Sequence, residues 1–256
     1  MPAPHLDRIR EQFTRQADAY SRMRQIADER GLAALVALVD TKPEDRALDV
    51  ACGPGFLTLA FAARCAEAVG FDATPAFVER AAAEAARRGA ANARFESGEA
   101  ERLPFADASF GVVACRAAFH HFPRPARVLA QMKRVTRPGG RLLVADMVSD
   151  EDPAKRAYQD RIERLCDPTH VRALPESEFD ALFAAAGLRV LRRPQSSFDY
   201  DVDEWIAHGG PGPEAVREIE ALLEASLETD RSGLRVRREA QKLRFSHRTV
   251  AFVLAR

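Results

Sequence analysis

Hydrophobic positions along the chain follow two periods, one typical of helices and one typical of strands. Apolar side chains recur every three or four residues from Leu6 to Tyr20, which predicts an amphipathic helix, and a second helix is expected over 23–39. Short apolar runs of the kind found in buried parallel strands occur between later turns. They predict strands at 48–52, 68–71, 93–97, 110–115 and 142–148.

Helical segments separate most of these strands. A helix is expected over 56–66, and Thr74 and Pro75 suit the start of the next helix, with Gly89 just past its end. The second half of the chain predicts helices at 175–186 and 214–227, a strand at 188–191 and a final edge strand at 249–255. Strands that alternate with helices are typical of an α/β fold with a mainly parallel sheet.

The turn after the first predicted strand is the most informative stretch. Gly53 and Gly55 make a tight turn without side chains in the way, so backbone N–H groups can approach a ligand at the start of the next helix. Asp49, near the end of the strand, could place a carboxylate in the same crevice. An acidic residue at this point suits a ligand that carries a positive charge or an amine.

Two features relate this turn to nucleotide-binding sites. The dinucleotide fingerprint asks for a third glycine, but Thr58 stands there, and Pro54 separates the first two. Asp72 ends the second strand 19 residues after Gly53, at the distance where a carboxylate accepts hydrogen bonds from ribose hydroxyls. The alternative for Asp72 is a capping or turn aspartate.

The stretch 46–60 resembles motif I of class I S-adenosylmethionine (SAM)-dependent methyltransferases, with Ala51 where many members have a first glycine. The segment 98–111 is similar to the family's Gly-Asp-Ala-x-x-Leu-Pro-Phe…Phe-Asp pattern, with Glu99 and Gly111 in place of the two aspartates. The segment 120–140 resembles the family's His-His-Phe…Arg-Val-Leu-Lys-Pro-Gly-Gly block. Together these motifs resemble the ubiquinone/menaquinone-biosynthesis-like (methyltransferase type 11) group.

The resemblance implies an α/β fold with a Rossmann-like, seven-stranded, mostly parallel sheet, helices on both faces and helical cap insertions. We expect a single domain over 1–256, with an antiparallel last strand. Lid helices would occupy 1–40, a cofactor-binding core 41–150, and cap insertions 151–175 and 201–240. The implied activity is in-line transfer of a methyl group from SAM to a small-molecule acceptor, in which positioning supplies most of the rate enhancement.

A cofactor-binding set accompanies this expectation. By resemblance, Glu99 and the backbone of Ala100 would contact the adenine, although a solvated turn also explains Glu99. Phe13 and Tyr20 either pack the first helix or form a lid over the cofactor. The predicted set is Asp49, Ala51, Gly53, Gly55, Asp72, Ala73, Glu99, Ala100, Cys115 and Tyr20.

Candidate groups for proton transfer follow the fourth strand and lie in the cap. His120 and His121 follow the strand end, and we expect only one of them to face the crevice, as a structural group or as a base. His170 and Arg172 lie in an Asp-Pro-Thr-His-Val-Arg loop that is similar to a subgroup motif. They either line the acceptor pocket or brace the cap, with Asp167 as a partner of Arg172.

Amino-acid composition limits the classes of binding partner that we expect. Lys plus Arg and Asp plus Glu number 38 each, so no global field favours nucleic acid. Four cysteines without Cys-x-x-Cys pairing suggest reduced thiols of a cytoplasmic protein without a metal. No apolar run is long enough to span a membrane. An acidic block at 201–230 and a basic block at 231–248 are expected to pair with each other or to face solvent. The sequence leaves open whether the protein forms a homodimer.

Two other functions stay open from the sequence alone. An NAD(P)-type Rossmann oxidoreductase shares the strand-end carboxylate, but the missing third glycine at Thr58 weighs against it. A protein that binds SAM without transferring a methyl group would carry the same binding motifs, because those motifs are not catalytic residues.

Overall fold

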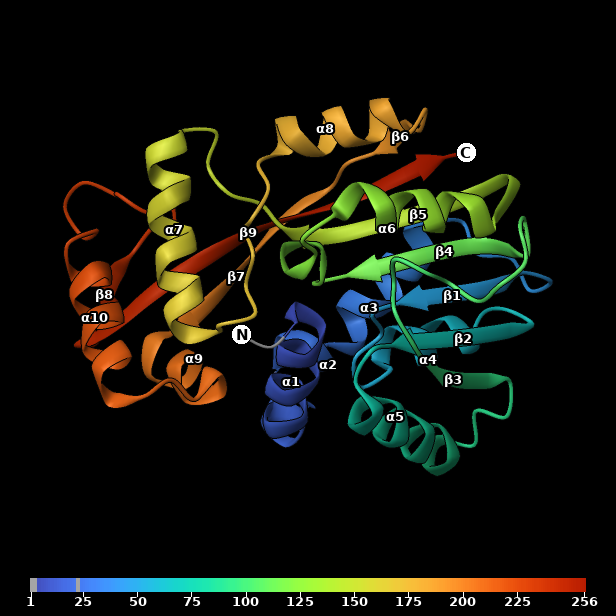
Figure 1. Cartoon of the computed structure of the whole chain (residues 1–256), viewed down its shortest axis with the longest axis horizontal. Helices are drawn as coiled ribbons and strands as arrows, with labels where there is room; N and C mark the ends of the chain where they lie inside the picture. The colour runs from blue at the N-terminus through green and yellow to red at the C-terminus, as the bar shows by residue number, and fades with distance from the viewer. Residues whose placement is uncertain (1–3, 22–23) are drawn as a thin grey trace.

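A computed structural model describes residues 4–21 and 24–256, whose strands join in one mixed sheet. The strand order is β3-β2-β1-β4-β5-β9-β6, and β7 and β8 also pair with β9 (Figure 1). The strands are β1 (Arg46–Val50), β2 (Glu67–Asp72), β3 (Ala93–Ser97), β4 (Phe110–Arg116), β5 (Thr136–Met147), β6 (Arg189–Arg192), β7 (Gln195–Asp201), β8 (Arg237–Glu239) and β9 (Lys242–Ala255).

The sheet is parallel where the sequence predicts it. β1 pairs in parallel with β2 and β4, β2 with β3, and β4 with β5, whereas every pair that involves β9 is antiparallel. The strand order reverses between β1 and β4, and ligands of open α/β sheets bind at the carboxyl ends beside such a reversal. The α/β prediction is therefore confirmed.

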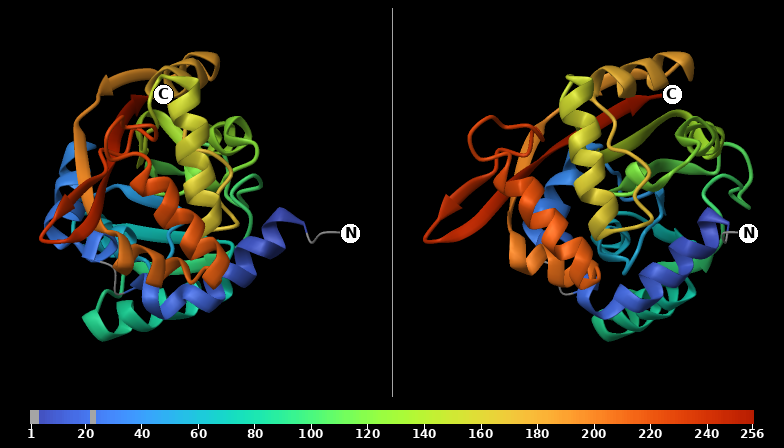
Figure 2. Two further views of the ribbon diagram at one scale, coloured as in Figure 1. Left: turned by 90° about the vertical axis from the view of Figure 1, so that its left-hand side faces the viewer. Right: turned by 60° about the vertical axis from the view of Figure 1, so that its left-hand side comes forward.

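The predicted strand count and the predicted edge strand are wrong. The described sheet has nine strands rather than seven, because β9 is longer than the predicted 249–255 segment and continues beyond β5. Its first half pairs with β8 and β7, and its second half lies between β5 and β6. The final strand is thus internal to the sheet, and its early part forms the long arm seen in Figure 2.

Helices cover both faces of the sheet, and more helices cap one end of it (Figures 1 and 2). Adjacent β1 residues contribute to two different cores: Ala47 packs with Leu57 and Leu32, whereas Leu48 packs with Val128 and Phe179. The helices are α1 (His5–Ser21), α2 (Arg24–Ala27), α3 (Glu29–Leu38), α4 (Phe56–Ala62), α5 (Pro75–Arg88), α6 (Pro125–Val135), α7 (Pro153–Cys166), α8 (Glu176–Ala185), α9 (Val202–Gly209), α10 (Pro213–Glu224) and the 3₁₀ turn η1 (Phe119–His121).

Helix boundaries differ from the predictions at several points, and α10 ends at Glu224 rather than at 227. The second predicted helix is divided at Asp28, whose side chain caps α3 by accepting a hydrogen bond from the Arg30 N–H; its predicted start at Met23 lies outside the described residues. α4 ends at Ala62 rather than at 66. α5 begins at Pro75 and is followed by Gly89 in the left-handed region, as predicted.

The cap has a hydrophobic core of its own. Ile162 of α7, Trp205 of α9 and Leu223 of α10 pack with Phe245 of β9. The oppositely charged blocks pair as predicted: Lys242 Nζ lies 2.8 Å from an Asp201 carboxylate oxygen, and Arg238 pairs with Glu224.

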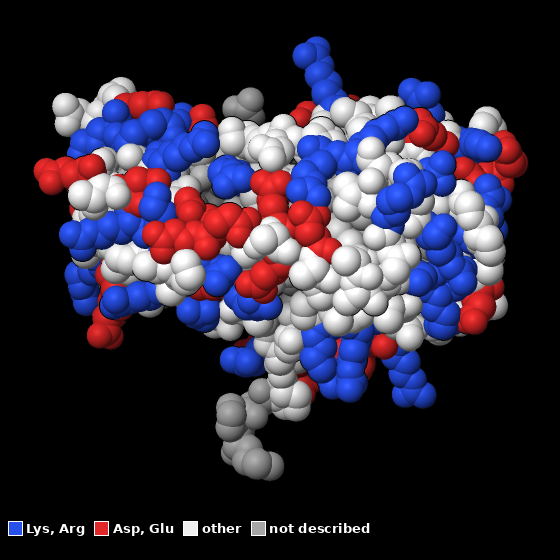
Figure 3. All heavy atoms as spheres, turned by 90° about the horizontal axis from the view of Figure 1, so that it is seen from above, with Lys and Arg blue, Asp and Glu red and all other residues white. Residues whose placement is uncertain are grey.

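The surface carries both signs of charge. Figure 3 shows basic and acidic side chains intermixed over the face seen from above. None of the helices in the part of the chain that the structure describes is long and apolar enough to cross a membrane.

Candidate functional site

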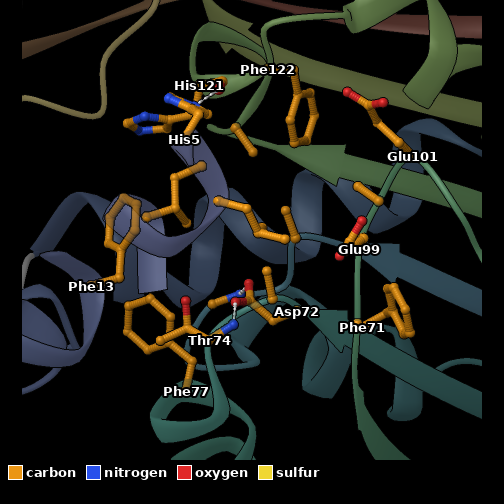
Figure 4. A pocket seen from close by; sticks show the side chains of 18 of the residues that line it. His5, Phe13, Phe71, Asp72, Thr74, Phe77, Glu99, Glu101, His121 and Phe122 are labelled. Carbon is orange, nitrogen blue, oxygen red and sulfur yellow. Dashed lines mark hydrogen bonds between the residues drawn. The ribbon is translucent and has the colours of Figure 1, made fainter. Parts of the chain in front are cut away.

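A cavity of about 320 Å³ opens at the carboxyl ends of β1, β2 and β4. Its walls come from α1, from the glycine turn after β1, from the end of β2 and from the loops that follow β3 and β4. Figure 4 shows Asp72 and Thr74 on one side of this first cavity, with His121 and Phe122 on the opposite side and Phe13 beside them. The cavity is therefore at the place where the strand order predicts a ligand.

The glycine turn shapes one wall through its backbone. Gly53 has φ +52°, and a Cβ built there would meet only Tyr20 Cε1 at 3.8 Å, so the space beside Gly53 belongs to the cavity. Gly55 has φ +81°, and its Cβ would lie 2.7 Å from Ala81 Cβ and from Phe95 Cε1. Gly53 therefore borders the cavity, whereas Gly55 is required for the packing of α4 against α5.

Asp72 links the two loops that form the floor of the cavity. Its Oδ2 accepts a hydrogen bond from the Gly53 N–H at 2.9 Å, and its Oδ1 accepts one from the Thr74 N–H at 2.8 Å. Burial raises the pKa of Asp72 against these hydrogen bonds. Thr74 Oγ1 is buried at the cavity and has no hydrogen-bond partner among the described residues. The floor thus carries the Asp72 carboxylate with the Thr74 hydroxyl beside it.

Asp49 lies beside a small side cavity of about 30 Å³, together with Arg116 and Tyr20. Its carboxylate accepts a 2.8 Å hydrogen bond from Thr58 Oγ1. Thr58, which replaces the third glycine of the dinucleotide fingerprint, therefore orients Asp49. Burial raises the pKa of Asp49 to about 7, although the Thr58 hydrogen bond and the charge of Arg116 lower it.

Seven of the ten predicted cofactor residues border the first cavity, and three do not: Asp49 lines the side cavity, and Gly55 and Cys115 line neither. Ala51, Gly53, Asp72, Ala73, Glu99, Ala100 and Tyr20 line it. Cys115 is 0% exposed within β4 and lines none of the cavities described here, and neither does Gly55. Cys115 packs in the core with Val113, and Gly55 packs against Ala81, so neither residue borders the cavity; their predicted contact with the cofactor stays a prediction.

Aromatic side chains of α1 close the first cavity. The Phe13 ring meets the rings of Tyr20, Phe77 and His121 at centroid distances of 5.8, 5.8 and 5.3 Å. The His5 Nε2 lies 2.8 Å from the His121 carbonyl oxygen, which ties the start of α1 to η1. The packing interpretation of Phe13 and Tyr20 is therefore confirmed, and both side chains also line the first cavity; a lid over the cofactor stays a prediction.

A second cavity, of about 140 Å³, lies beyond this aromatic layer and gathers five of the six histidines of the chain. Three of the five are held by buried carboxylates. His120 Nδ1 lies 2.6 Å from Asp146, His170 Nε2 lies 2.8 Å from Asp160, and His247 Nε2 lies 2.7 Å from Glu163. The lining histidines are His120, His121, His170, His208 and His247.

Electrostatics distinguish these groups. Burial lowers the pKa of His120, but the charge of Asp146 and its hydrogen bond outweigh burial and raise that pKa above its ordinary value. Burial raises the pKa of Asp146, and His120 more than reverses this effect. Burial and the neighbouring His120 lower the pKa of His121 to about 3, so His121 is neutral. His120 is therefore the member of the pair that can hold or release a proton near neutral pH.

The structure corrects two predictions about these residues. His120 and His121 both face cavities, because η1 turns the chain so that His121 borders both cavities and His120 borders the second. Arg172 does not line the second cavity: its side chain is 46% exposed and pairs with Glu178 at 2.6 Å. His170, two residues earlier, does line it.

Several lining residues were absent from the sequence prediction. They are Glu163 and Cys166 of α7, Tyr200 of β7, Trp205 and His208 of α9 and His247 of β9. None stands in a motif, and His247 meets Glu163 across 84 residues. In the described part of the chain, no three His, Cys, Asp or Glu side chains form a group suited to a metal ion.

Comparisons with known proteins agree with this geometry. Residues 41–187 match the family described as "Methyltransferase domain". The chain is 34% identical over 207 residues to the uncharacterized methyltransferase YcgJ of Bacillus subtilis, covering 81% of this chain and 82% of the relative. The crystal structure of YcgJ superposes with a TM-score of 0.83 at 31% identity, covering 87% of this chain and 96% of that one.

Two further relatives have more specific names. A demethylmenaquinone methyltransferase of Thermus thermophilus is 33% identical over 184 residues, covering 64% of this chain and 83% of the relative. The 27-O-demethylrifamycin SV methyltransferase of Amycolatopsis mediterranei is 30% identical over 199 residues, covering 76% and 69%. The prediction of a methyltransferase is confirmed, and the alternative of a nicotinamide-dependent oxidoreductase is wrong. The chain belongs to the methyltransferase domain family and is a class I SAM-dependent methyltransferase.

Proposed function

We propose that this enzyme methylates a hydroxyl group of a small molecule, with SAM in the first cavity and the acceptor's reacting end in the second. The observation that carries the proposal is the junction of the two cavities. Phe13, Tyr20, Ala117 and His121 line both of them. A group held in one cavity can therefore meet a group held in the other.

The first cavity fits the cofactor in its shape and in its donors. Asp72, together with the unpartnered Thr74 hydroxyl, would hold the ribose, and the backbone at Gly53 leaves room for close approach. Glu99 and Ala100 would border the adenine. When bound, SAM supplies an electrophilic methyl group, whose bond to sulfur breaks as its bond to the acceptor forms, leaving S-adenosylhomocysteine.

Within the second cavity, His120 is the best-placed base. Its Nδ1 is held by Asp146, which leaves Nε2 to accept the proton of an acceptor hydroxyl. His170 is held through Nε2 by Asp160, which leaves Nδ1 and makes it a second candidate. Asp146 is a positioning residue, because its oxygens also accept hydrogen bonds from the Ala118, Phe119 and Met147 N–H groups.

The size of the second cavity supports a small-molecule acceptor. Its volume is about 140 Å³, and its walls are buried groups such as His170 and Trp205. The names of two relatives, a demethylmenaquinone and a demethylrifamycin methyltransferase, also refer to small-molecule acceptors. A site closed by α1 and α9 would exclude water from the transfer.

Binding and turnover test the proposal separately. Trp205 is the only tryptophan of the chain and lines the second cavity, so its fluorescence can report titrations with S-adenosylhomocysteine and, for comparison, NADH. Methyl-labelled SAM incubated with fractionated small molecules would then identify the acceptor. We expect S-adenosylhomocysteine to bind and NADH not to bind.

Substitutions at the second cavity test whether its histidines act in methyl transfer. All six histidines border one of the two cavities, so the matched control is Arg172→Ala, outside both. We expect His120→Ala to lose most methyl transfer and to keep S-adenosylhomocysteine affinity. If S-adenosylhomocysteine binds but no fraction is methylated, the protein binds SAM without methyl transfer and the proposal fails.

A further inference from the structure

A long apolar groove of about 480 Å³ continues from the second cavity toward the surface. It runs between α3 on one side and β7 and β9 on the other. Leu35 and Leu38 contribute the helical wall, and Phe198 and Val250 contribute the strand wall. The groove shares six lining residues with the second cavity, namely Ile26, Ala117, His120, Met147, Tyr200 and His247.

The two ends of the groove differ in chemistry. At its inner end lie His120, Tyr200 and His247, three of the polar groups of the second cavity. Toward its outer end the wall is formed by leucines and by Ala34 and Ser196, both of which are exposed. The groove shares only Ala117 with the first cavity, so the cofactor site and the groove extend in different directions from one junction.

The volumes of the second cavity and the groove indicate which of them can hold a whole small molecule. Pockets that enclose a whole small molecule usually measure roughly 300–1,000 Å³. The second cavity, at about 140 Å³, is below this range, whereas the groove, at about 480 Å³, lies within it. An acceptor whose hydroxyl lies at His120 must therefore extend beyond the second cavity, and the groove is the adjoining space that does not belong to the cofactor site.

We propose that the groove binds the apolar body of the acceptor, so that the substrate is an amphiphile with a hydroxylated head and an extended hydrocarbon part. This inference rests on the proposed function, because it takes the reacting hydroxyl to lie among the histidines. The hydrocarbon part would lie along Leu35, Leu38 and Phe198, where it is removed from water. The proposal predicts that affinity depends on the length of the apolar part and not only on the head.

Two probes that share a head test this dependence. Resorcinol presents only the hydroxylated ring, and 4-hexylresorcinol adds six carbons that can enter the groove. Calorimetric titrations of enzyme saturated with S-adenosylhomocysteine should show 4-hexylresorcinol binding at least tenfold more tightly than resorcinol, with one molecule bound per chain. Equal affinities, no binding of 4-hexylresorcinol, or a stoichiometry of several molecules per chain would overturn the proposal.

A pair of surface substitutions locates the effect. Ala34 and Ala37 are both exposed alanines of α3, but only Ala34 lines the groove. Ala34→Glu introduces a charge beside the hydrocarbon part and should weaken 4-hexylresorcinol binding at least fivefold, with resorcinol binding unchanged. Ala37→Glu should change neither. If the two variants behave alike, the groove is not the binding site.

The same experiments separate this inference from the proposed function. Methyl transfer from labelled SAM to identified acceptors is measured on the wild-type enzyme and on Ala34→Glu. If methyl transfer occurs but shows no preference for apolar acceptors, the groove proposal is wrong and the proposed function stands. If S-adenosylhomocysteine binds and no acceptor is methylated, the proposed function fails, whatever the probes bind.

Discussion

The Asp146 carboxylate allows one prediction to be worked out in detail. It is 3% exposed, lies at the end of β5 and holds the loop that carries His120. One of its oxygens accepts hydrogen bonds from the Ala118 N–H at 3.0 Å and the Phe119 N–H. The other accepts from His120 Nδ1 at 2.6 Å and from the Met147 N–H at 2.7 Å. The substitution Asp146→Asn keeps the shape but replaces one acceptor oxygen with an NH₂ donor.

The loss of stability expected for Asp146→Asn follows from these hydrogen bonds. If Oδ2 is replaced, the Ala118 and Phe119 N–H groups lose their acceptor; if Oδ1 is replaced, the Met147 N–H loses its acceptor, and His120 keeps a hydrogen bond only in the tautomer whose Nδ1 accepts. A hydrogen bond to a charged group contributes about 1.5–3 kcal/mol, so the loss of one or two corresponds to about 1.5–6 kcal/mol. Because a domain is stabilised by only about 5–15 kcal/mol, we expect a large fall in the free energy of unfolding.

Urea denaturation followed by Trp205 fluorescence measures this difference. The matched control is Asp107→Asn, whose side chain is 76% exposed and pairs with Arg134; we expect it to lose about 1 kcal/mol or less. If Asp146→Asn is no more destabilised than this control, the hydrogen bonds to Asp146 do not hold the loop and the reasoning is refuted.

The pH dependence of the same difference is a second check. The raised pKa of His120 means that its contribution is complete below its ordinary value of 6.5 and is lost as pH rises through the folded-state pKa. The lowered pKa of Asp146 means that its contribution is present above its ordinary value of 3.8 and is lost as pH falls. The difference in the free energy of unfolding between wild type and Asp146→Asn should therefore be largest between pH 3.8 and pH 6.5. It should narrow as pH rises through the raised pKa of His120 and as pH falls through the lowered pKa of Asp146.

Four further predictions concern the two cavities. Asp72→Ala should weaken S-adenosylhomocysteine binding by about 1–3 kcal/mol in calorimetry, the range for a hydrogen bond to a charged or buried group; unchanged affinity would exclude Asp72 from the cofactor site. Gly53→Val should abolish that binding in a protein whose circular dichroism shows it to be folded, because its side chain fills the cavity. His170→Ala should reduce methyl transfer with nearly wild-type cofactor affinity, whereas Arg172→Ala should reduce neither; the opposite pattern would return Arg172 to the site. Since His120 acts as a base only when neutral and its pKa is raised, kcat/KM should fall as pH drops through a value above 6.5, and a pH-independent rate would argue against it.

The residues of the first cavity could be predicted from the sequence because their positions depend on local patterns. Gly53 lies in the turn after β1, and Asp72 ends β2, so their positions depend only on two parallel neighbours in register. Even here the separate tasks of the two glycines were not visible. Only the packing of α5 shows that Gly55 is needed for contact with Ala81, whereas Gly53 borders the first cavity.

The residues that line the second cavity are determined by the tertiary structure. Sequence spacing nominated His170 and Arg172 alike, but the loop places one beside Asp160 in the cavity and the other beside Glu178 at the surface. His247 was not predicted at all, because its partner Glu163 is 84 residues away and β9 was expected to be shorter and at the edge.

The sequence by itself determined the family, the parallel half of the sheet and the strand-end residues at the first cavity. These follow from hydrophobic periods, turn chemistry and short motif spacings, which act between neighbours along the chain. Only the tertiary structure decided the histidine cavity, the groove beside α3 and the internal position of β9. Such features arise where segments far apart in the sequence pack together, and no local pattern encodes which buried carboxylate a given histidine will meet.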